Sequence, residues 1–283
     1  MKFGIQMFPA DYAIPVTELG PACEDLGFDS LLFPEHTHIP TSRRTPWPGG
    51  APLPKEYSHT LDPFVAIAAT AAVTKTLLIG TGICLVMERD PITLAKEVAS
   101  ADFLSGGRVL FGIGGGWNEE EMENHGTKPS LRWKILRERI LAMKEIWTKD
   151  EAEYHGEFVN FDPIWSWPKP ARKPHPPIMM GGDGARTLDR VLDYCDEWMP
   201  IGGRMGGMDH LKSRIDELQT RAAAIGRGHI PVSIFGVAPQ PAIIEAYRDM
   251  GVDRAIFGLR ADAPENALGA LKHYAEVMKP YRE

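Results

Sequence analysis

The sequence contains few cysteines and no long apolar run. Cys23, Cys84 and Cys195 are its only cysteines, and each falls within an apolar or helical pattern far from the others. This spacing fits neither a disulfide framework nor a metal knuckle, so we expect small buried thiols in a reduced compartment. No apolar run approaches the ~20 residues of a membrane span, and the N-terminus lacks a signal-peptide pattern. These absences predict a cytoplasmic protein without membrane contact.

Clustered basic residues are also scarce. The chain has 31 lysines and arginines against 38 acidic residues, a formal net charge of -7. Surfaces that bind nucleic acid or anionic membranes usually carry clustered lysine and arginine, and the doublet of Arg43 and Arg44 is too small to form one. We therefore expect no nucleic-acid partner.

The segment from Leu77 to Trp117 predicts one strand, helix, strand unit. It reads LLIGTGICLV, then MERDPITLAKEVASADFLSGG, then RVLFGIGGGW. The two apolar runs lack alternation, which is typical of parallel strands buried on both faces, and Pro91 suits the first turn of the helix between them. The glycines lie at the carboxyl end of the second run, where parallel α/β folds place their ligands.

The same pattern recurs along the chain. Other apolar runs predict strands at Phe3–Phe8, Ser30–Phe33, Ile178–Met180, Glu197–Ile201, Val232–Val237 and Ala255–Leu259. With the two strands above this makes eight, each followed by a helical stripe, and no linker separates two cores. A single domain over residues 1–283, folded as a closed (β/α)8 TIM barrel of about 250 residues with insertions, is therefore predicted. A doubly wound open sheet is the alternative.

Two stretches interrupt this rhythm. Residues 37–60 are rich in proline and glycine and too long for an ordinary connection, so they form either a lid over a site or a plain mobile loop. Residues 151–177 contain short aromatic pieces followed by six prolines from Pro163 to Pro177, which forbid a continuous helix. We expect this second segment to be an irregular insertion wrapped on the surface.

The glycines after residue 111 permit two interpretations. Gly112, Gly114, Gly115 and Gly116 suggest a dinucleotide fingerprint, but Trp117 stands where its third glycine is needed, and no acidic residue closes a strand about 20 residues later. Close approach of the planar or phosphate portion of a ligand to the barrel rim is favoured over that fingerprint. A glycine-rich turn without a ligand is the other possibility.

Glu35, His36 and His38 follow the second strand and form the other chemical cluster. Two histidines in a barrel suggest a metal-dependent hydrolase, but the later strands end without the further histidine or aspartate ligands that such a site needs, so no metal is expected. An imidazole ionises near neutral pH and exchanges protons readily. We therefore predict that His36 carries a proton, the alternative being that it anchors a loop.

The segment from Gly80 to Trp117, with YHGEFVNF, KPARKPHPPIMMGG and the helix that follows, carries a resemblance across nearly the whole chain. It is similar to the luciferase-like monooxygenase superfamily, and more closely to the branch that uses the deazaflavin coenzyme F420. The resemblance implies a barrel with insertions, in agreement with the strand pattern. It also implies a strand bulge with a cis peptide bond from Gly82 to Ile83, where Ile83 and Leu85 back one face of the coenzyme ring.

Further residues are assigned by this resemblance. At the end of the second strand, Glu35 matches a coenzyme contact and His36 a proton donor. The positions expected to hold the ring, its side chain and its tail are Gly115, Gly116, Glu120, Gly181, Gly182, Asp183 and Gly184. Trp117 replaces a glutamate of the sugar-phosphate dehydrogenases in this branch, which argues against that substrate. Trp117 and His38 are expected beside the substrate instead.

The resemblance thus implies an F420-dependent oxidoreductase that exchanges a hydride with an organic substrate while His36 handles the proton. Two alternatives remain: an FMN-dependent monooxygenase, and a barrel that binds a flavin without turnover. A homodimer is usual in the superfamily. The alanine-rich helix at Pro63–Val73 suits such an interface, although packing inside one chain explains the same alanines.

Overall fold

The computed structural model describes residues 1–50, 52–203 and 206–282, and in this part of the chain eight parallel strands form a barrel. The strands are β1 (Lys2–Gln6), β2 (Ser30–Phe33), β3 (Leu78–Cys84), β4 (Val109–Ile113), β7 (Ile178–Gly181), β8 (Glu197–Met199), β9 (Ser233–Val237) and β10 (Arg254–Gly258). Their order is β8-β7-β4-β3-β2-β1-β10-β9, and parallel bridges from Trp198 to Val232 and from Ile201 to Phe235 close the ring. The predicted (β/α)8 barrel is confirmed.

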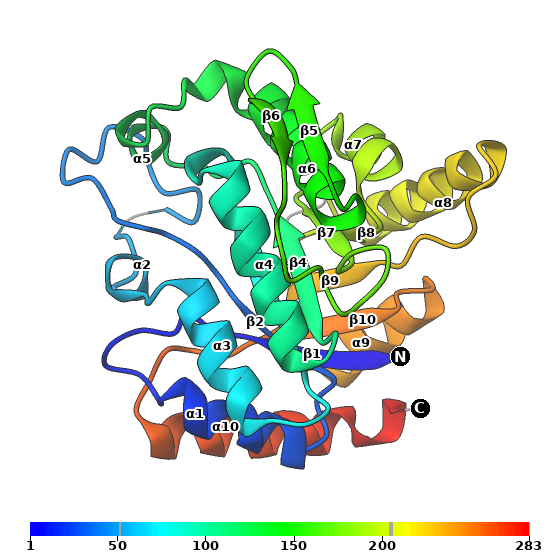
Figure 1. Cartoon of the computed structure of the whole chain (residues 1–283). Helices are drawn as coiled ribbons and strands as arrows, with labels where there is room; N and C mark the ends of the chain where they lie inside the picture. The colour runs from blue at the N-terminus through cyan, green and yellow to red at the C-terminus, as the bar shows by residue number, and fades with distance from the viewer. Residues whose placement is uncertain (51, 204–205, 283) are drawn as a thin grey trace.

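A helix follows each barrel strand and covers the outside of the ring, as Figure 1 shows for α3 and α4. These helices are α1 (Val16–Asp25), α3 (Pro63–Val73), α4 (Pro91–Ser105), α6 (Arg132–Thr148), α7 (Thr187–Tyr194), α8 (Met208–Ala224), α9 (Pro241–Asp249) and α10 (Pro264–Met278). Shorter helices lie in the connections, namely α2 (Glu56–His59) and α5 (Glu119–Asn124).

Local sequence signals set the ends of the helices that flank β3. Asp62 and Asp90 cap α3 and α4, and their carboxylates accept hydrogen bonds from backbone N–H groups of the first turn. A proline follows each cap at the first helical position, where its missing N–H costs nothing. Gly106, in the left-handed conformation, then ends α4 and returns the chain to β4.

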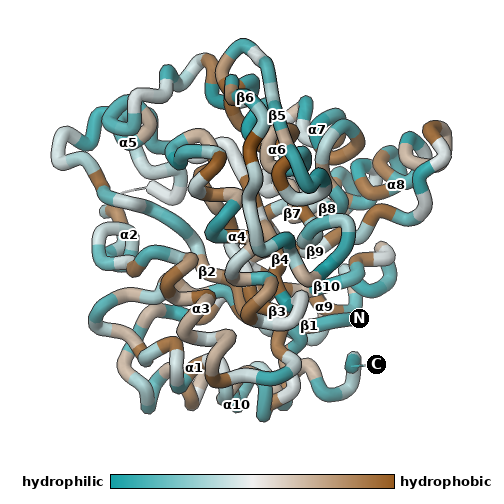
Figure 2. The backbone as a smooth tube through the Cα atoms, viewed as in Figure 1, coloured by the Kyte–Doolittle hydropathy of each residue, from teal (hydrophilic) through white to brown (hydrophobic). Residues whose placement is uncertain are grey.

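Apolar side chains pack both inside the ring of strands and between the strands and the outer helices. Figure 2 shows the most hydrophobic backbone along the central strands, with hydrophilic segments around them. An inner cluster under the mouth of the barrel contains Leu32, Leu110, Met179, Met199 and Ile256. The buried guanidinium of Arg254 fills the opposite end, paired with Glu197 at 3.1 Å and Asp29 at 3.0 Å. These layers fill the barrel below its mouth, and the mouth is left as the open end.

The two predicted insertions differ in how much regular secondary structure they contain. Residues 151–177 are not wholly irregular as expected, because β5 (Ala152–His155) and β6 (Asn160–Ile164) pair as an antiparallel hairpin that stands beside α6 in Figure 1. The sequence does not predict this hairpin, because its strands are short and β6 contains Pro163. Residues 37–60 contain α2, and the chain beyond it returns to the barrel by a bridge from Ala10 to Thr60.

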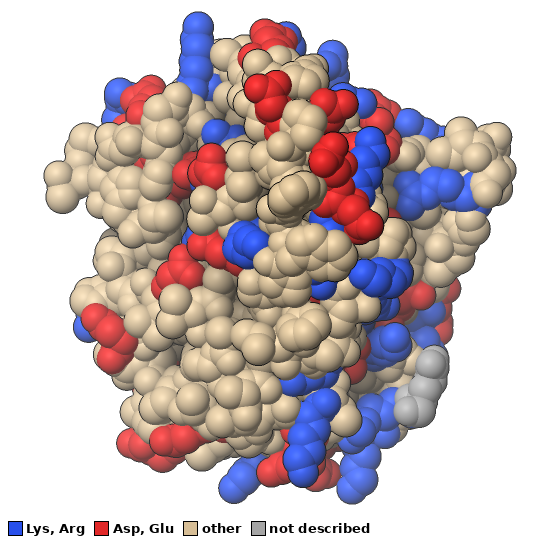
Figure 3. All heavy atoms as spheres, in the orientation of Figure 1, with Lys and Arg blue, Asp and Glu red and all other residues tan. Residues whose placement is uncertain are grey.

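Surface and cysteine features agree with the composition. Cys23, Cys84 and Cys195 are free and buried, as predicted. The face in Figure 3 carries basic and acidic side chains interspersed, without a large patch of either sign. Among the described residues, no helix combines the length and apolar character needed to cross a bilayer.

Candidate active site

A cavity of about 650 Å³ opens at the carboxyl end of the strands. Its walls come from the segments after β1, β2, β3, β4, β7 and β8, and from Trp47, Pro48 and Tyr57 of the 37–60 loop. Cavities of this size hold small organic ligands and cofactors, and most lie at this end of a TIM barrel. The loop therefore forms part of the wall, as a lid would.

The floor of the cavity is a bulge in β3. The peptide bond from Gly82 to Ile83 is cis, as expected, and the pairing of β3 with β4 shifts register between Thr81 and Cys84. The Ile83 side chain lies between two glycines. A Cβ atom added to Gly114 would come within 2.9 Å of Ile83 Cγ1, and one added to Gly181 within 2.7 Å of Ile83 Cγ2. Glycine at these two positions leaves room for Ile83 as an apolar platform.

Glu35 braces this bulge. Its buried carboxylate accepts hydrogen bonds of 2.6 Å from the Leu85 backbone N–H and from Arg89 Nε. Burial opposes the charge of Arg89, but attraction to the Glu35 carboxylate and the hydrogen bonds to Asp62 and Glu35 together outweigh this and raise the pKa of Arg89. Glu35 borders the cavity, yet both its carboxylate oxygens are already engaged. Glu35 thus supports Leu85 from a position in the cavity wall, and its expected contact with the coenzyme stays a prediction.

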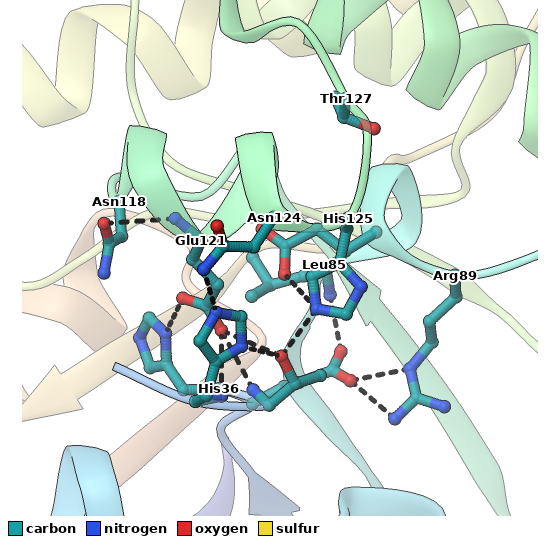
Figure 4. A network of polar contacts seen from close by, with 12 residues as sticks. His36, Leu85, Arg89, Asn118, Glu121, Asn124, His125 and Thr127 are labelled. Carbon is teal, nitrogen blue, oxygen red and sulfur yellow. Dashed lines mark hydrogen bonds and ion pairs between the residues drawn. The ribbon is translucent and has the colours of Figure 1, made fainter. Parts of the chain in front are cut away.

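His36 lines the cavity and is held from both ring nitrogens. Its Nδ1 lies 2.6 Å from Oε2 of Glu121, whose side chain is 1% exposed, and Trp117 Nε1 donates to its Nε2 at 3.2 Å. Because indole N–H only donates, Nε2 is the acceptor and Nδ1 carries the proton in the neutral ring. The carboxylate thus fixes one tautomer and directs the basic nitrogen toward the cavity. Figure 4 shows His36 beside Glu121 of α5.

Aromatic rings surround His36 within the cavity. Ring centroids of Tyr57 and Trp117 lie 5.2 Å and 5.7 Å from that of His36, and the tilted ring of Phe8 packs against Tyr57 at 4.6 Å. Trp47 packs edge-on against Tyr57 at 5.6 Å. Trp117 therefore lies in the cavity, where a residue beside the substrate was predicted. Phe8, Trp47, Tyr57 and Trp117 together give this part of the cavity an aromatic wall.

Two expected site residues lie outside the cavity walls. The carboxylate of Glu120 accepts hydrogen bonds from Ser42 Oγ at 3.0 Å and from the backbone N–H and hydroxyl of Thr45. Burial opposes its charge, but these bonds prevail and lower the pKa of Glu120 to about 2. Glu120 therefore anchors the 37–60 loop and does not line the ring site as predicted.

His38 is the second expected site residue that lies outside the cavity walls. Its Nε2 lies 2.8 Å from Asn124 Nδ2, and its Nδ1 lies 2.9 Å from Thr37 Oγ1. These contacts hold the ring against the outer side of α5, away from the residues that line the cavity. The chain turns between His36 and His38, so the two imidazoles do not share a chamber, and the expected contact of His38 with substrate is not supported.

The other end of the cavity is polar and basic. Gly181, Gly182, Asp183 and Gly184 line it as predicted, and the first turn of α7 adds Arg186 and Arg190. The guanidinium of Arg190 lies 3.7 Å from the ring centroid of Trp133, which also lines the cavity. Basic side chains at the start of a helix favour an anionic group such as a phosphate.

Comparison with known proteins agrees with this architecture. The model of the luciferase-like monooxygenase family matches residues 9–278. The chain belongs to this family. An uncharacterized protein from Mycobacterium tuberculosis is 36% identical over 280 residues, covering 97% of this chain and 98% of that protein. Family members are oxidoreductases and monooxygenases.

Two further similarities involve different coenzymes. An FMNH2-dependent dimethylsulfone monooxygenase of Pseudomonas putida is 33% identical over 153 residues, 52% of this chain and 41% of its own. The solved structure of an F420-dependent secondary alcohol dehydrogenase, in complex with an F420-acetone adduct, has a TM-score of 0.80. The two chains are 18% identical, and the match covers 100% of this chain and 99% of the dehydrogenase. This similarity concerns the fold. The proteins similar to this chain thus include an FMNH2-dependent enzyme and, by fold, an F420-dependent one.

The cavity fits a flat ring with an anionic tail. Ile83 provides an apolar surface between Gly114 and Gly181, where side chains are absent and a ring can approach the backbone. Arg186 and Arg190 lie where a phosphate on the tail would need positive charge. Both FMN and F420 have such a ring and phosphate, so the donor set of this luciferase-like site suits either.

Several site residues were missed from the sequence. Glu121 holds His36, although the resemblance directed attention to its neighbour Glu120. Three consecutive glutamates begin α5, and the sequence gives no periodic signal for which of them faces inward. Trp133 and Arg190 were also missed, because they meet only when α6 and α7 pack together.

Proposed function

We propose that this protein is an oxidoreductase that uses coenzyme F420 to transfer a hydride to or from a neutral organic substrate. One observation carries the proposal: His36 presents Nε2 to the same cavity that Ile83 floors, while Glu121 holds its Nδ1. Oxidation of an alcohol to a carbonyl compound removes a hydride and a proton. A base and an apolar platform within one cavity supply what those two transfers require.

Each part of the cavity has a task in this proposal. The coenzyme, when bound, supplies a ring carbon that accepts or gives the hydride. Ile83 would support the ring, and Arg186 and Arg190 would hold its phosphate. His36 Nε2 would take the proton from a substrate hydroxyl, or return one to a carbonyl oxygen. For this the indole N–H of Trp117 must give up its hydrogen bond to Nε2.

The wall around His36 indicates the class of substrate. Phe8, Trp47, Tyr57 and Trp117 provide aromatic faces, and the nearby Glu35 carboxylate is already paired with Arg89. An apolar or aromatic alcohol or ketone suits such a wall, because it loses little hydration on entry and packs against rings. A phosphorylated sugar suits this wall less, because the guanidinium of Arg43 already lies over the Trp117 ring, 5.7 Å from its centroid.

Turnover tests the proposed function directly. The purified protein, oxidised F420 and a panel of neutral alcohols are expected to give reduced coenzyme and the matching ketone or aldehyde. The similarity to the dimethylsulfone monooxygenase favours a second candidate, an FMN-dependent monooxygenase. Oxygen consumption that requires reduced FMN, with no F420 reduction, would establish that candidate instead. Tight flavin binding without turnover across the panel would indicate a binding protein.

We also propose that the protein is a homodimer and is cytoplasmic. The support for the dimer is α3, whose exposed face carries Val65, Ala68, Ala72 and Val73 and no charged residue. A helix that is apolar on all sides is normally buried. The neighbouring α4 exposes Phe103 and Leu104, and Figure 3 shows mostly uncharged surface over these two helices.

A further inference from the structure

A hydrogen-bonded chain leads from His36 away from the cavity to the molecular surface. Glu121 Oε2 contacts His36 Nδ1 at 2.6 Å, and Thr37 Oγ1 donates to Glu121 Oε1 at 3.4 Å. The same hydroxyl lies 2.7 Å from His125 Nε2 and 2.9 Å from His38 Nδ1. His36 and Glu121 are buried, whereas Thr37 and His125 are exposed. Figure 4 shows this cluster between β2 and α5.

We propose that Glu121, Thr37 and the two surface histidines His38 and His125 form a proton path between His36 and solvent. The proposal rests on the proposed function, in which His36 exchanges a proton with substrate. It adds a route by which His36 passes a proton to solvent in each turnover. A substrate and coenzyme that fill the cavity cover Nε2, so the imidazole has to lose its extra proton through Nδ1, on the side away from the cavity.

The transfers balance without any change in electrons. Nε2 takes the proton of the substrate hydroxyl, and the proton on Nδ1 passes to Oε2 of Glu121. Rotation of that carboxyl group presents the proton to Thr37 Oγ1, whose own proton passes to His125 Nε2 or His38 Nδ1. The surface histidine then releases a proton to water. One proton has moved from substrate to solvent, Glu121, Thr37 and the surface histidine are restored, and His36 is left with its proton on Nε2. After the product leaves, Nε2 releases that proton to water that enters the cavity, and Nδ1 regains one along the same path.

The charges around the path are compatible with this direction. Burial, and then the neighbouring His38, lower the pKa of His125, so its imidazole is neutral at neutral pH and can take up a proton. Glu88 Oε2 lies 3.8 Å from that nitrogen. Burial and the carboxylates of Glu121 and Glu35 raise the pKa of Glu88 to about 9, so Glu88 is neutral there. Arg89 remains paired with Glu35, and Asn124 orients His38.

Thr37→Val tests the path because valine has the shape of threonine without the hydroxyl. The side chain is exposed and its backbone N–H to Glu121 is retained, so the fold should persist. Thr37→Ser, which keeps the hydroxyl, is the matched control. The first readout needs no coenzyme: exchange of the His36 Nδ1 proton with water, followed by NMR of the whole protein. We expect exchange about tenfold slower in Thr37→Val and unchanged in Thr37→Ser.

Turnover provides a second readout. With the path intact, the rate should not depend on buffer concentration. In Thr37→Val the rate should fall and recover as imidazole buffer is added, which a merely structural role of Thr37 would not produce. Exchange and turnover equal to wild type in Thr37→Val would overturn the path while leaving the proposed function intact. Slow exchange in Thr37→Val, in a protein that neither binds nor reduces F420, would support the path and refute the proposed function.

Discussion

At the scale of single residues, the site depends on which neighbour each polar group faces. His36, Ile83 and Trp117 lie in the cavity as their positions after strands predicted, because strand ends converge at one rim of a barrel. His38 and Glu120 do not line the cavity. Neighbouring residues in a segment point in different directions, so a cavity-lining position does not predict the orientation of residues close to it in the chain. Such orientations depend on the packing of α5 against the 37–60 loop, which the sequence does not encode locally.

His36 is predicted to act on turnover and not on coenzyme binding. His36→Gln keeps a polar side chain but cannot shuttle a proton, so turnover should fall by roughly 100-fold or more. The coenzyme dissociation constant, measured by fluorescence titration, should change less than about twofold because His36 is held by Glu121 and Trp117. His59→Gln, at an exposed histidine bonded to Asp11, is the control and should change neither quantity. Undiminished turnover in His36→Gln would remove the assigned role.

Glu88 makes folding stability depend on pH. Burial raises the pKa of its carboxyl group to about 9 in the folded protein, against an ordinary value of 4.5, so unfolding between these pH values releases a proton. The stability that this proton contributes is complete below the unfolded value and is lost as pH rises toward the folded one. Glu88→Gln stays neutral throughout. We expect the variant to be more stable than wild type by roughly 1 to 3 kcal/mol near pH 8 and to converge with it in acid.

Urea unfolding across that pH range measures the difference. Glu97→Gln is a useful comparison, because Glu97 is less buried and pairs with Arg89. Identical pH slopes for wild type and Glu88→Gln would contradict the assignment of a neutral buried carboxyl group.

At the scale of elements, the strands and main helices were largely predictable and their connections were not. Buried parallel strands are continuous apolar runs, and the caps at Asp62 and Asp90 mark helix starts directly in the sequence. The strands of the β5–β6 hairpin are short and mix apolar with polar residues, so they are not continuous apolar runs and carry no such signal. The contact between Trp133 of α6 and Arg190 of α7 likewise depends on how two helices pack.

The β3 bulge and the end of β7 should act together on the coenzyme. A Cβ atom at Gly181 would lie 2.7 Å from Ile83 Cγ2 and 3.1 Å from the carbonyl oxygen of Ile113. Gly181→Ala should therefore displace Ile83 toward the cavity and weaken coenzyme binding about tenfold, a shift of about 1.4 kcal/mol. Gly269→Ala, where no atom lies within 4 Å of the added methyl, is the control. Wild-type affinity in Gly181→Ala, measured by titration, would show that Ile83 does not support the ring.

At the scale of the whole molecule, the barrel brings distant segments to one mouth and leaves an apolar face over α3 and α4 on the outside. The side chains of Val65 and Leu104 there are 66% and 73% exposed. If this face joins two copies, the wild-type protein should sediment at twice its 31.4 kDa mass. Val65→Glu with Leu104→Glu should yield monomers, since burying two unpaired charges opposes association.

Ile225→Glu is the control for that experiment, because Ile225 is also an exposed apolar residue, 58% accessible, at the end of α8. It should leave the dimer intact. A wild-type protein that sediments as a monomer at all concentrations would refute the proposed interface.

The central claim is that a deazaflavin ring lies on Ile83 with its anionic tail near Arg186 and Arg190. Side-by-side fluorescence titration of the purified protein with F420 and with FMN tests it most directly. We predict saturable, one-to-one binding of F420, at least about tenfold tighter than binding of FMN, a difference of about 1.4 kcal/mol. Binding of FMN alone, or of neither compound, would contradict the claim.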